Sequence, residues 1–98
     1  MAIKIGKLFG TDKLVGTDDD DLLIALGAKT TLIGGLGNDV LLGGLNNDTL
    51  IGGKGADYLS GGLGTDTVDY SGSDAGVKVN LTTGKGSGGD AEGDTIVL

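Results

Sequence analysis

The chain has 98 residues and a formal charge of −7, with 22 glycines and 38% apolar residues. Its seven lysines are its only cationic side chains, and this acidic balance argues against nucleic-acid binding. The absence of cysteine excludes disulfides and, together with the absence of histidine, argues against a zinc site. A glycine-rich chain of this length forms one domain at most, and its core is too small to offset the entropy of folding by itself. A divalent cation is the counter-charge that this composition favours.

Residues 1–6 are the first predicted element. In the segment MAIKIGK, Ile3 and Ile5 alternate with other residues, which is the pattern of a short strand with two apolar side chains on one face. We expect this segment to be a capping strand at the N-terminal end of the fold.

A nine-residue frame then runs without insertion from residue 7 to residue 69. Its regular part is residues 34–69, where four units follow one another: GGLGNDVLL, GGLNNDTLI, GGKGADYLS and GGLGTDTVD. Positions 1 and 2 are always Gly, position 6 is always Asp, and position 8 is always apolar. The glycines permit the positive φ of a tight bend, and Asn46, at position 4 of the second unit, tolerates the same conformation. Each unit is predicted to be a bend followed by a three-residue strand whose position 8 faces inward.

Three less regular windows occupy residues 7–33, before these units. The first two keep the position-6 aspartate, as Asp12 and Asp21. The third window, residues 25–33, is degenerate because Thr30 stands in place of the aspartate. We expect the bend of this window to be unable to hold a cation.

The run Asp18–Asp21 has two interpretations. One is a dedicated acidic metal site. The other is a solvated bend in which Asp21 is the ligand of the repeat, and in which Asp18 and Asp19 serve at most as extra ligands. We prefer the second interpretation because runs of like charge are usually solvated.

After Asp69 the frame breaks, and residues 70–98 are predicted to be an insertion followed by a resumed repeat. Val77, Val79 and Leu81 alternate with polar residues, which predicts a strand of about five residues. The Gly/Ser-rich segment after this strand predicts a turn.

The repeat resumes at residues 93–97, with Asp94 at position 6 and Ile96 at position 8. Asp90, Glu92 and Asp94 form either an additional cation site or a solvated turn, and the sequence leaves both interpretations open. The last strand, at the end of the chain, is typical of a repeat that continues in a longer parent protein.

The unit G-G-x-G-x-D-x-U-x resembles the calcium-binding nonapeptide of the RTX (repeats-in-toxin) family, clearly so over residues 34–69. The resemblance implies an all-β fold, a right-handed parallel β-roll (a β-solenoid) in which two nonapeptides make one coil. It also implies a C-terminal capping insertion, because family members carry a segment similar to D-Y-S-x-x-x-x-G-V-x-V-N-L-x-T-G-x-G after a repeat block. Residues 1–98 are then a single RTX domain, with residues 1–6 as the N-terminal cap, 7–69 as repeats and 70–98 as insertion and resumed repeat.

The resemblance implies calcium ions between bends n and n+2, where bend carbonyls and position-6 carboxylates supply the hard oxygen ligands that calcium prefers. One edge of the roll should carry Asp12, Thr30, Asp48 and Asp66, and the other Asp21, Asp39 and Asp57. Three pairs then have two carboxylates: Asp21/Asp39, Asp39/Asp57 and Asp48/Asp66. Asp39 is the only aspartate shared by two of these pairs, and the pairs that include Thr30 should be weak or empty.

The candidate ligands belong to about three or more calcium ions. They are Asp12, Asp21, Asp39, Asp48, Asp57, Asp66, Asp94, Gly35, Gly37, Gly44, Asn46, Gly53, Gly55, Gly62 and Gly64.

The expected function is a calcium-binding module whose folding is driven by calcium. The sequence has no nucleophile elbow and no phosphate-binding loop, and carboxylates next to cations have a lowered pKa, the opposite of what a general acid needs. We therefore expect the chain not to be an enzyme. No apolar run is long enough for a transmembrane helix. The family resemblance implies type I secretion and an extracellular location.

An alternative function is an adhesive, partner-binding or polysaccharide-binding surface on the roll. Outward positions are unusually apolar, which favours contact with a parent protein or a second copy of the chain. They are Leu22, Ile24, Val40 and Leu42 on one face, and Val15, Ile33 and Ile51 on the other. A column of Thr31, Thr49 and Thr67 is the feature that favours a polysaccharide or ice surface.

Overall fold

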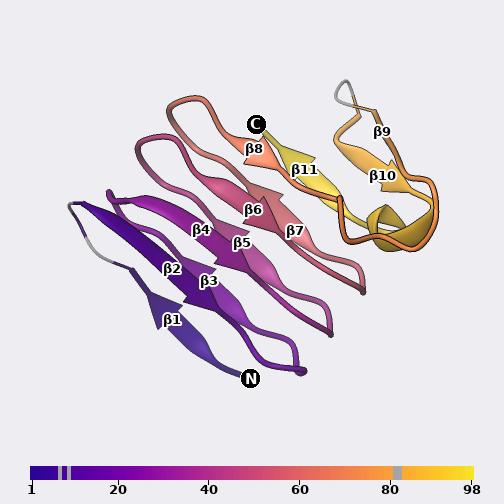
Figure 1. Ribbon diagram of the computed structural model, residues 1–98, viewed down its shortest axis with the longest axis horizontal. Coiled ribbons are helices and arrows are strands. Elements are labelled where there is room, and N and C mark those ends of the chain that lie inside the picture. The colour runs from indigo at the N-terminus through magenta and orange to yellow at the C-terminus, as the bar shows by residue number, and fades with distance from the viewer. Residues whose placement is uncertain (7, 9, 81–82) are drawn as a thin grey trace.

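The computed structural model describes residues 1–6, 8, 10–80 and 83–98. In this part of the chain, strands alternate between two sheets that lie face to face, and each coil is stacked on the one before (Figure 1). No helix among the described residues could cross a membrane. The elements are β1 (Ile3–Ile5), β2 (Thr11–Val15), β3 (Leu22–Ile24), β4 (Lys29–Ile33), β5 (Val40–Leu42), β6 (Thr49–Ile51), β7 (Tyr58–Ser60), β8 (Thr67–Val68), β9 (Lys78–Asn80), β10 (Lys85–Ser87), the 3-10 turn η1 (Gly89–Ala91) and β11 (Thr95–Val97).

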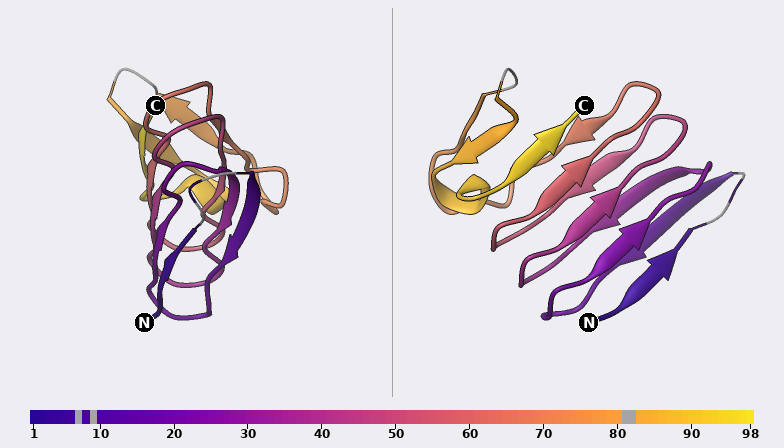
Figure 2. Two further views of the ribbon diagram at one scale, coloured as in Figure 1. Left: turned by 90° about the vertical axis from the view of Figure 1, so that its left-hand side faces the viewer. Right: turned by 180° about the vertical axis from the view of Figure 1, so that it is seen from behind.

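The sheet topology follows the nine-residue frame. One sheet has the strand order β1-β3-β5-β7-β11-β10-β9, and the other has the order β2-β4-β6-β8. Leu23, Leu41 and Leu59 are in register in the first sheet, and Leu32 and Leu50 are in register in the second. Adjacent parallel strands of the repeats are therefore separated by two nonapeptides in the sequence. Figure 2 shows the resulting narrow roll from its end. The predicted all-β parallel β-roll is confirmed.

The core is the column of position-8 side chains between the two sheets. Leu23, Leu41 and Leu59 from one sheet meet Leu32 and Leu50 from the other, and all five have no exposed surface. The outward residues of the three-residue strands are exposed or partly buried, as the two-residue period of a strand requires. Because the core is one side chain deep on each sheet, little apolar surface is available to stabilise the bends.

Strands β2 and β4 are longer than predicted. Each has five residues instead of three, and they pair from Thr11↔Lys29 to Val15↔Ile33. Neither window begins with glycine, whereas the window that gives the three-residue strand β3 begins with Gly16. In β2 and β4 the chain does not make the tight bend, and positions 5 and 6 are extended and join the strand.

The N-terminal segment forms the edge strand of the larger sheet. Strand β1 pairs in parallel with β3, and Ile3 and Ile5 lie on the exposed outer face. Lys4 is in register with Leu23, in the inward column. Its Nζ donates a hydrogen bond of 2.7 Å to the carbonyl oxygen of Val15, so a polar group closes this end of the core.

The prediction for the C-terminal insertion was wrong in one respect. The strand expected near Val77–Leu81 is Lys78–Asn80, and Leu81 lies outside the described residues. The segment expected to be a turn contains β10, which pairs antiparallel with β9 and with β11. A Cβ on Gly86 would lie 2.6 Å from the carbonyl oxygen of Ala91, so this glycine lets β10 pass close over η1.

The last strand of the chain returns to the roll. Strand β11 pairs in parallel with β7, and Ile96 enters the core beside Leu59. The insertion strands β10 and β9 lie beyond β11 and extend the larger sheet at the C-terminal end of the roll (Figure 1).

Candidate metal centre

The bends require glycine for two different reasons. At positions 2 and 4 the backbone has positive φ, between 75° and 103° in the glycines from Gly35 to Gly64, and Asn46 adopts φ 67°. Asn46 is the only non-glycine residue with positive φ among the described residues. At position 1 the φ is ordinary, but a Cβ on Gly34 would lie 2.5 Å from Oδ2 of Asp39 in the same bend. Position 1 is glycine because the aspartate occupies the space of a side chain.

Stacked bends enclose gaps that are lined with carbonyl oxygens. The carbonyl oxygen of Gly35 lies 2.5 Å from the place of a Cβ on Gly53 in the next bend on that edge. In the same way, the carbonyl oxygen of Gly37 lies next to the place of a Cβ on Gly55. No side chain fits there, and oxygens line the space instead.

The same arrangement recurs in two further gaps. Between bends 16–21 and 34–39, the carbonyl oxygens of Thr17 and Asp19 lie 2.7 Å from the Cβ positions of Gly35 and Gly37. Between bends 43–48 and 61–66, the carbonyls of Gly44 and Asn46 face Gly62 and Gly64. The three gaps are those between the predicted pairs Asp21/Asp39, Asp39/Asp57 and Asp48/Asp66.

One oxygen of each position-6 carboxylate links neighbouring coils. Oδ1 of Asp39 accepts the backbone N–H of Asp21 at 2.9 Å, and Oδ1 of Asp57 accepts that of Asp39 at 2.8 Å. On the other edge, Oδ1 of Asp48 and Oδ1 of Asp66 accept the N–H groups of Thr30 and Asp48 at 2.9 and 2.8 Å. These bonds stack Asp21, Asp39 and Asp57 along one edge, and Thr30, Asp48 and Asp66 along the other.

The second carboxylate oxygen has no such partner in four of these residues. Oδ2 of each is buried and has no hydrogen-bond partner among the residues that the structure describes. The four residues are Asp39, Asp48, Asp57 and Asp66. A buried carboxylate oxygen without a donor is costly, and a cation is the partner that removes the cost. The donor set, carboxylate oxygen with several carbonyls, is the one that calcium prefers.

Side chains alone cannot complete a cation site. No group of three or more histidine, cysteine, aspartate or glutamate side chains is close enough to hold a metal in the described part of the chain. Any calcium site in the roll must therefore take most of its ligands from backbone carbonyls, as the bends provide.

Burial raises the pKa of the central carboxyl groups. With the protein's own groups around them, the pKa of Asp39 rises to about 6 and that of Asp57 to about 8, chiefly because burial penalises the charged form. Burial also raises the pKa of Asp48. For these three groups, the lowered carboxyl pKa expected from the sequence requires a cation that offsets the desolvation.

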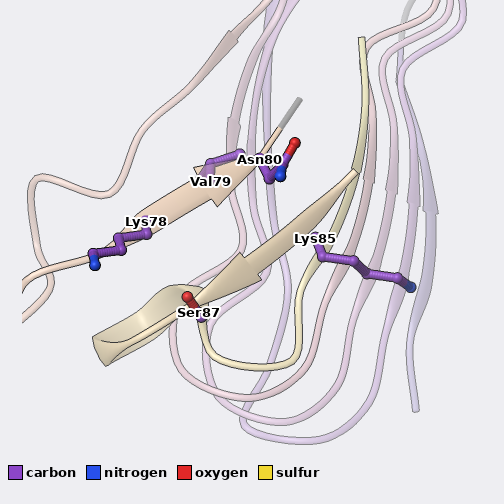
Figure 3. A pocket seen from close by; sticks show the side chains of 5 residues that line it. All are labelled: Lys78, Val79, Asn80, Lys85 and Ser87. Atoms are coloured by element: carbon purple, nitrogen blue, oxygen red, sulfur yellow. The ribbon is translucent and has the colours of Figure 1, made fainter. Parts of the chain in front are cut away.

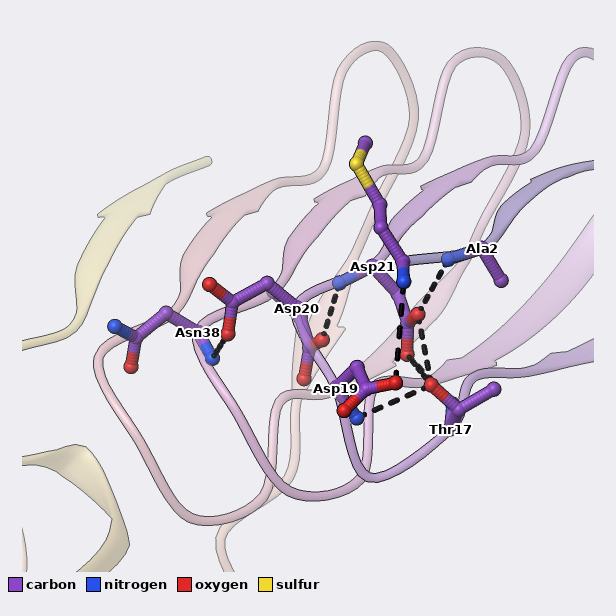
Figure 4. A network of polar contacts seen from close by, with 8 residues as sticks. Ala2, Thr17, Asp19, Asp20, Asp21 and Asn38 are labelled. Atoms are coloured by element: carbon purple, nitrogen blue, oxygen red, sulfur yellow. Dashed lines mark hydrogen bonds and ion pairs between the residues drawn. The ribbon is translucent and has the colours of Figure 1, made fainter.

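Asp21 differs from the four orphaned carboxylates because protein donors satisfy both of its oxygens. Oδ1 accepts the N–H of Ala2 at 2.8 Å, and Oδ2 accepts the N–H of Thr17 at 2.5 Å (Figure 4). The Thr17 hydroxyl also donates to the carboxylate. The Thr17 N–H holds the pKa of Asp21 below its usual value, against the effect of burial.

Asp94 extends the second edge beyond Asp57. Its Oδ1 accepts the N–H of Asp57 at 2.7 Å, although 37 residues separate the two. Its Oδ2 accepts the hydroxyl hydrogen of Tyr70 at 2.6 Å, and the residue is fully buried. Asp57 therefore has an aspartate on both sides, as Asp39 does. The sequence places Asp94 at position 6 and leaves a further cation site at this end open, but its spacing does not show that Asp94 lies next to Asp57.

Asp90 and Glu92 do not join Asp94 in an acidic cluster. Oε1 of Glu92, an exposed residue, accepts the N–H of Gly88, and the N–H of Asp90 donates to the hydroxyl of Ser73. Since the described residues contain no cluster of three acidic side chains, the structure favours the solvated turn.

A second ladder of side chains, at position 5, was missed by the sequence analysis. Oδ1 of Asp20 accepts the N–H of Asn38 at 2.7 Å, and Oδ1 of Asn38 accepts that of Ala56 at 2.8 Å. Asn47 bonds to Thr65 in the same way on the other edge. The signal was present, since three units have Asp or Asn at this position. Asp18, Asp19 and Asp20 are all exposed, but Asp20 also links two coils through its bond to Asn38.

The two remaining candidates lie in the irregular part of the roll. Asp12 and Thr30 are in register on β2 and β4. Oδ1 of Asp12 accepts the N–H of Lys13 at 2.8 Å, and the Thr30 hydroxyl donates to the carbonyl of Ala28 at 2.8 Å. That this pair binds calcium weakly or not at all stays a prediction.

The pocket on the C-terminal hairpin does not gather charge. It is lined by Lys78, Val79, Asn80, Lys85 and Ser87. In Figure 3 the two lysine side chains point to opposite sides, and Nζ of Lys85 donates to the hydroxyl of Thr95 at 3.1 Å. This hairpin therefore offers no converging cationic site for an anion.

The comparison with protein families agrees with the geometry. Residues 9–41 and 33–68 match the model of the RTX calcium-binding nonapeptide repeat (4 copies). No curated protein and no solved structure matches this chain.

Proposed function

Because the chain belongs to the RTX family of calcium-binding nonapeptide-repeat proteins, we propose that it is a calcium-binding β-roll module whose folding is driven by calcium. The observation that carries the proposal is the set of four buried Oδ2 oxygens without a donor, in bends whose gaps are lined by carbonyls. Calcium bound there cross-links successive coils and neutralises the carboxylates. The like charges along each edge keep the chain unfolded when calcium is absent.

The strongest sites combine both features of the geometry. We assign them to the gaps Asp39/Asp57 and Asp48/Asp66, where carbonyls line the space and Oδ2 has no protein donor. The gap Asp21/Asp39 has the carbonyls, but Thr17 already donates to Asp21, so its affinity should be lower. Three ions is the loading that this arrangement favours.

The energy of binding is sufficient to decide the fold. Extracellular calcium modules bind with dissociation constants of about 10⁻⁴–10⁻³ M. At about ten times that concentration each site adds roughly 1.4 kcal/mol, so three sites add about 4 kcal/mol. A whole small domain is stable by only about 5 kcal/mol or somewhat more.

The test is a far-UV circular-dichroism titration of the full chain. In chelator the spectrum should be that of a disordered chain, and millimolar calcium should convert it to β-structure. Magnesium should not, because it requires strict octahedral geometry and gives up water reluctantly. A β-spectrum that persists unchanged in chelator would refute the coupling of folding to calcium.

The same coupling supports an extracellular role. A chain that stays unfolded at low cytosolic calcium can be exported by type I secretion and fold outside the cell. We assign the chain a calcium-binding role and not a catalytic one, and we propose that it is a module of a larger parent protein. Within the module, residues 1–6 serve as the cap, 7–69 as repeats with 25–33 degenerate, and 70–98 as insertion and resumed repeat. Co-expression with a type I exporter should place the chain in the medium, and its retention in the cells would count against this route.

A second candidate function is self-association, in which the outer face of the larger sheet contacts a second copy of the chain. The strand register places Leu22 beside Val40 and Ile24 beside Leu42 on this face. The outward side chains of β3 and β5 are all apolar and none is charged, whereas the bends at both edges are acidic, so this face is where two like-charged copies can approach. Light scattering in calcium should report a dimer that Val40→Lys disrupts, and a monomeric wild type would exclude it.

One threonine column remains from the alternatives. Thr31, Thr49 and Thr67 are in register on the outer face of the smaller sheet, flanked by Ile33 and Ile51. If this column is a polysaccharide surface, the wild type should bind on a glycan array and Thr49→Lys should lose that binding. An array on which the wild type gives no signal would remove this alternative.

A further inference from the structure

One gap of the roll is bridged by a side chain. The Asn46 side-chain amide, through Nδ2, donates a hydrogen bond to the carbonyl oxygen of Gly27 in the degenerate bend. The bond joins bend 43–48 to bend 25–30, the two bends between which the repeat would place an ion. Asn46 is also the only residue at position 4 of the regular units that is not glycine.

The neighbouring bend explains why a side chain fits here. In the regular gaps, the carbonyl of the preceding position 4 occupies the place of a Cβ, as Gly37 does for Gly55 and Asn46 does for Gly64. Bend 25–30 has a different path, because its positions 5 and 6 belong to strand β4. Among the four regular units, the one with a side chain at position 4 is therefore the one stacked on a bend that is not tight.

The carbonyl oxygens of Ala25 and Leu26 line this gap beside Gly44, and most other polar groups in it have hydrogens as partners. The carbonyl of Gly27 accepts from Asn46, and Oδ1 of Asp48 accepts the N–H of Thr30. The Thr30 hydroxyl donates to the carbonyl of Ala28. The orphaned Oδ2 of Asp48 faces away from this gap, since it lies with the carbonyl of Gly61 against the Cβ position of Gly43. A cation has little to gain here.

We propose that Asn46 determines which gaps of this edge take calcium: its side-chain amide excludes the ion between bends 25–30 and 43–48 and joins these bends in its place. This inference rests on the proposed function. The two polar groups of Asn46 then have opposite roles. Its main-chain carbonyl lines the calcium gap toward bend 61–66, and its amide replaces the ion on the other side.

The test compares Thr30→Asp, Asn46→Gly and the double variant with the wild type. Titration calorimetry with calcium alone gives the number of ions bound per chain. Thr30→Asp restores the missing carboxylate but keeps the amide, so the number should stay that of the wild type. The double variant restores the repeat at both positions and should bind one further ion. Glycine is the residue that the repeat has at position 4, so the backbone conformation of Asn46 is preserved.

Asn46→Gly alone should bind the wild-type number of ions. Its melting temperature in calcium should be about 4–8 °C lower, the shift that a loss of about 1 kcal/mol causes in a domain of this size. A further ion in Thr30→Asp alone would overturn the proposal, since the amide would then not exclude calcium. So would a double variant that folds and gains no ion. A wild type that binds no calcium would instead refute the proposed function, which separates the two failures.

Discussion

Each position-6 aspartate divides its two carboxylate oxygens between two tasks. Oδ1 accepts a backbone N–H from the preceding coil, as in the 2.8 Å bond from Asp39 to Asp57, and Oδ2 is left for a cation. Asparagine can still accept through its one oxygen but carries no charge. The two tasks can therefore be separated by substitution.

Asp39→Asn and Asp57→Asn should each raise the calcium midpoint of folding about tenfold or more, a change that equals about 1.4 kcal/mol, because the cation loses an anionic ligand. Asp12→Asn is the control, since the neighbouring bend has Thr30 in place of an aspartate. Circular dichroism against free calcium measures the midpoints. Equal midpoints for Asp12→Asn and Asp57→Asn would contradict the assignment of the sites.

Glycine at position 1 can be tested with a matched pair. A Cβ on Gly52 would collide with the carboxylate of Asp57, with Cγ only 2.9 Å away, whereas a Cβ on Gly72 would meet nothing within 4 Å. Gly52→Ala should lower the stability in saturating calcium by about 1–3 kcal/mol, and Gly72→Ala should leave it unchanged or slightly higher. Thermal unfolding measures both, and equal melting temperatures would show that position 1 does not need the space.

At the level of elements, the C-terminal insertion closes the second edge through one hydrogen bond. The Tyr70 hydroxyl donates to Oδ2 of Asp94, so this aspartate is satisfied by the protein where Asp39 and Asp57 are not. Burial, together with the neighbouring Asp94, raises the pKa of the Tyr70 phenol, so it remains a donor at all physiological pH values. Thr17 has the corresponding position at Asp21, at the other end of this edge.

Tyr70→Phe should lower the stability in saturating calcium by about 1–3 kcal/mol, because a fully buried carboxylate oxygen then loses its donor. Tyr58→Phe removes a hydroxyl from an exposed residue on the outer face and should change little. Chemical denaturation in calcium compares the two variants. A loss of the same size in both would show that the bond to Asp94 does not close the edge.

The repeats could be read from the sequence because each position has one physical requirement. Positive φ at positions 2 and 4, the inward position 8 and the parallel register all followed from the nine-residue frame. Strand β10 could not be predicted, because Lys85-Gly86-Ser87 has no strand propensity of its own and is held by β9 and β11. The place of Asp94 above Asp57 depends on how the insertion folds, which spacing alone does not encode.

For the whole molecule, the buried carboxyl groups link the fold to pH as well as to calcium. The ordinary pKa of an aspartate in an unfolded chain is about 3.9. In the fold, burial raises the pKa of Asp39 to about 6 and that of Asp57 to about 8. A proton on either group therefore stabilises the folded chain without calcium. This stability is fully present below the unfolded pKa and is lost as the pH rises through the two folded values.

Between about pH 4 and pH 8 protons and calcium therefore compete for the same oxygens. In metal-free buffer, acidification from pH 8 to pH 5 should increase the folded fraction. In calcium, the same acidification should raise the midpoint severalfold, because binding must displace the protons. Circular dichroism at fixed free calcium measures both effects, and Asp57→Asn, which removes the group with the highest carboxyl pKa value, should reduce the pH dependence. A calcium midpoint that is constant from pH 5 to pH 8 would show that these carboxyl groups are not the ligands.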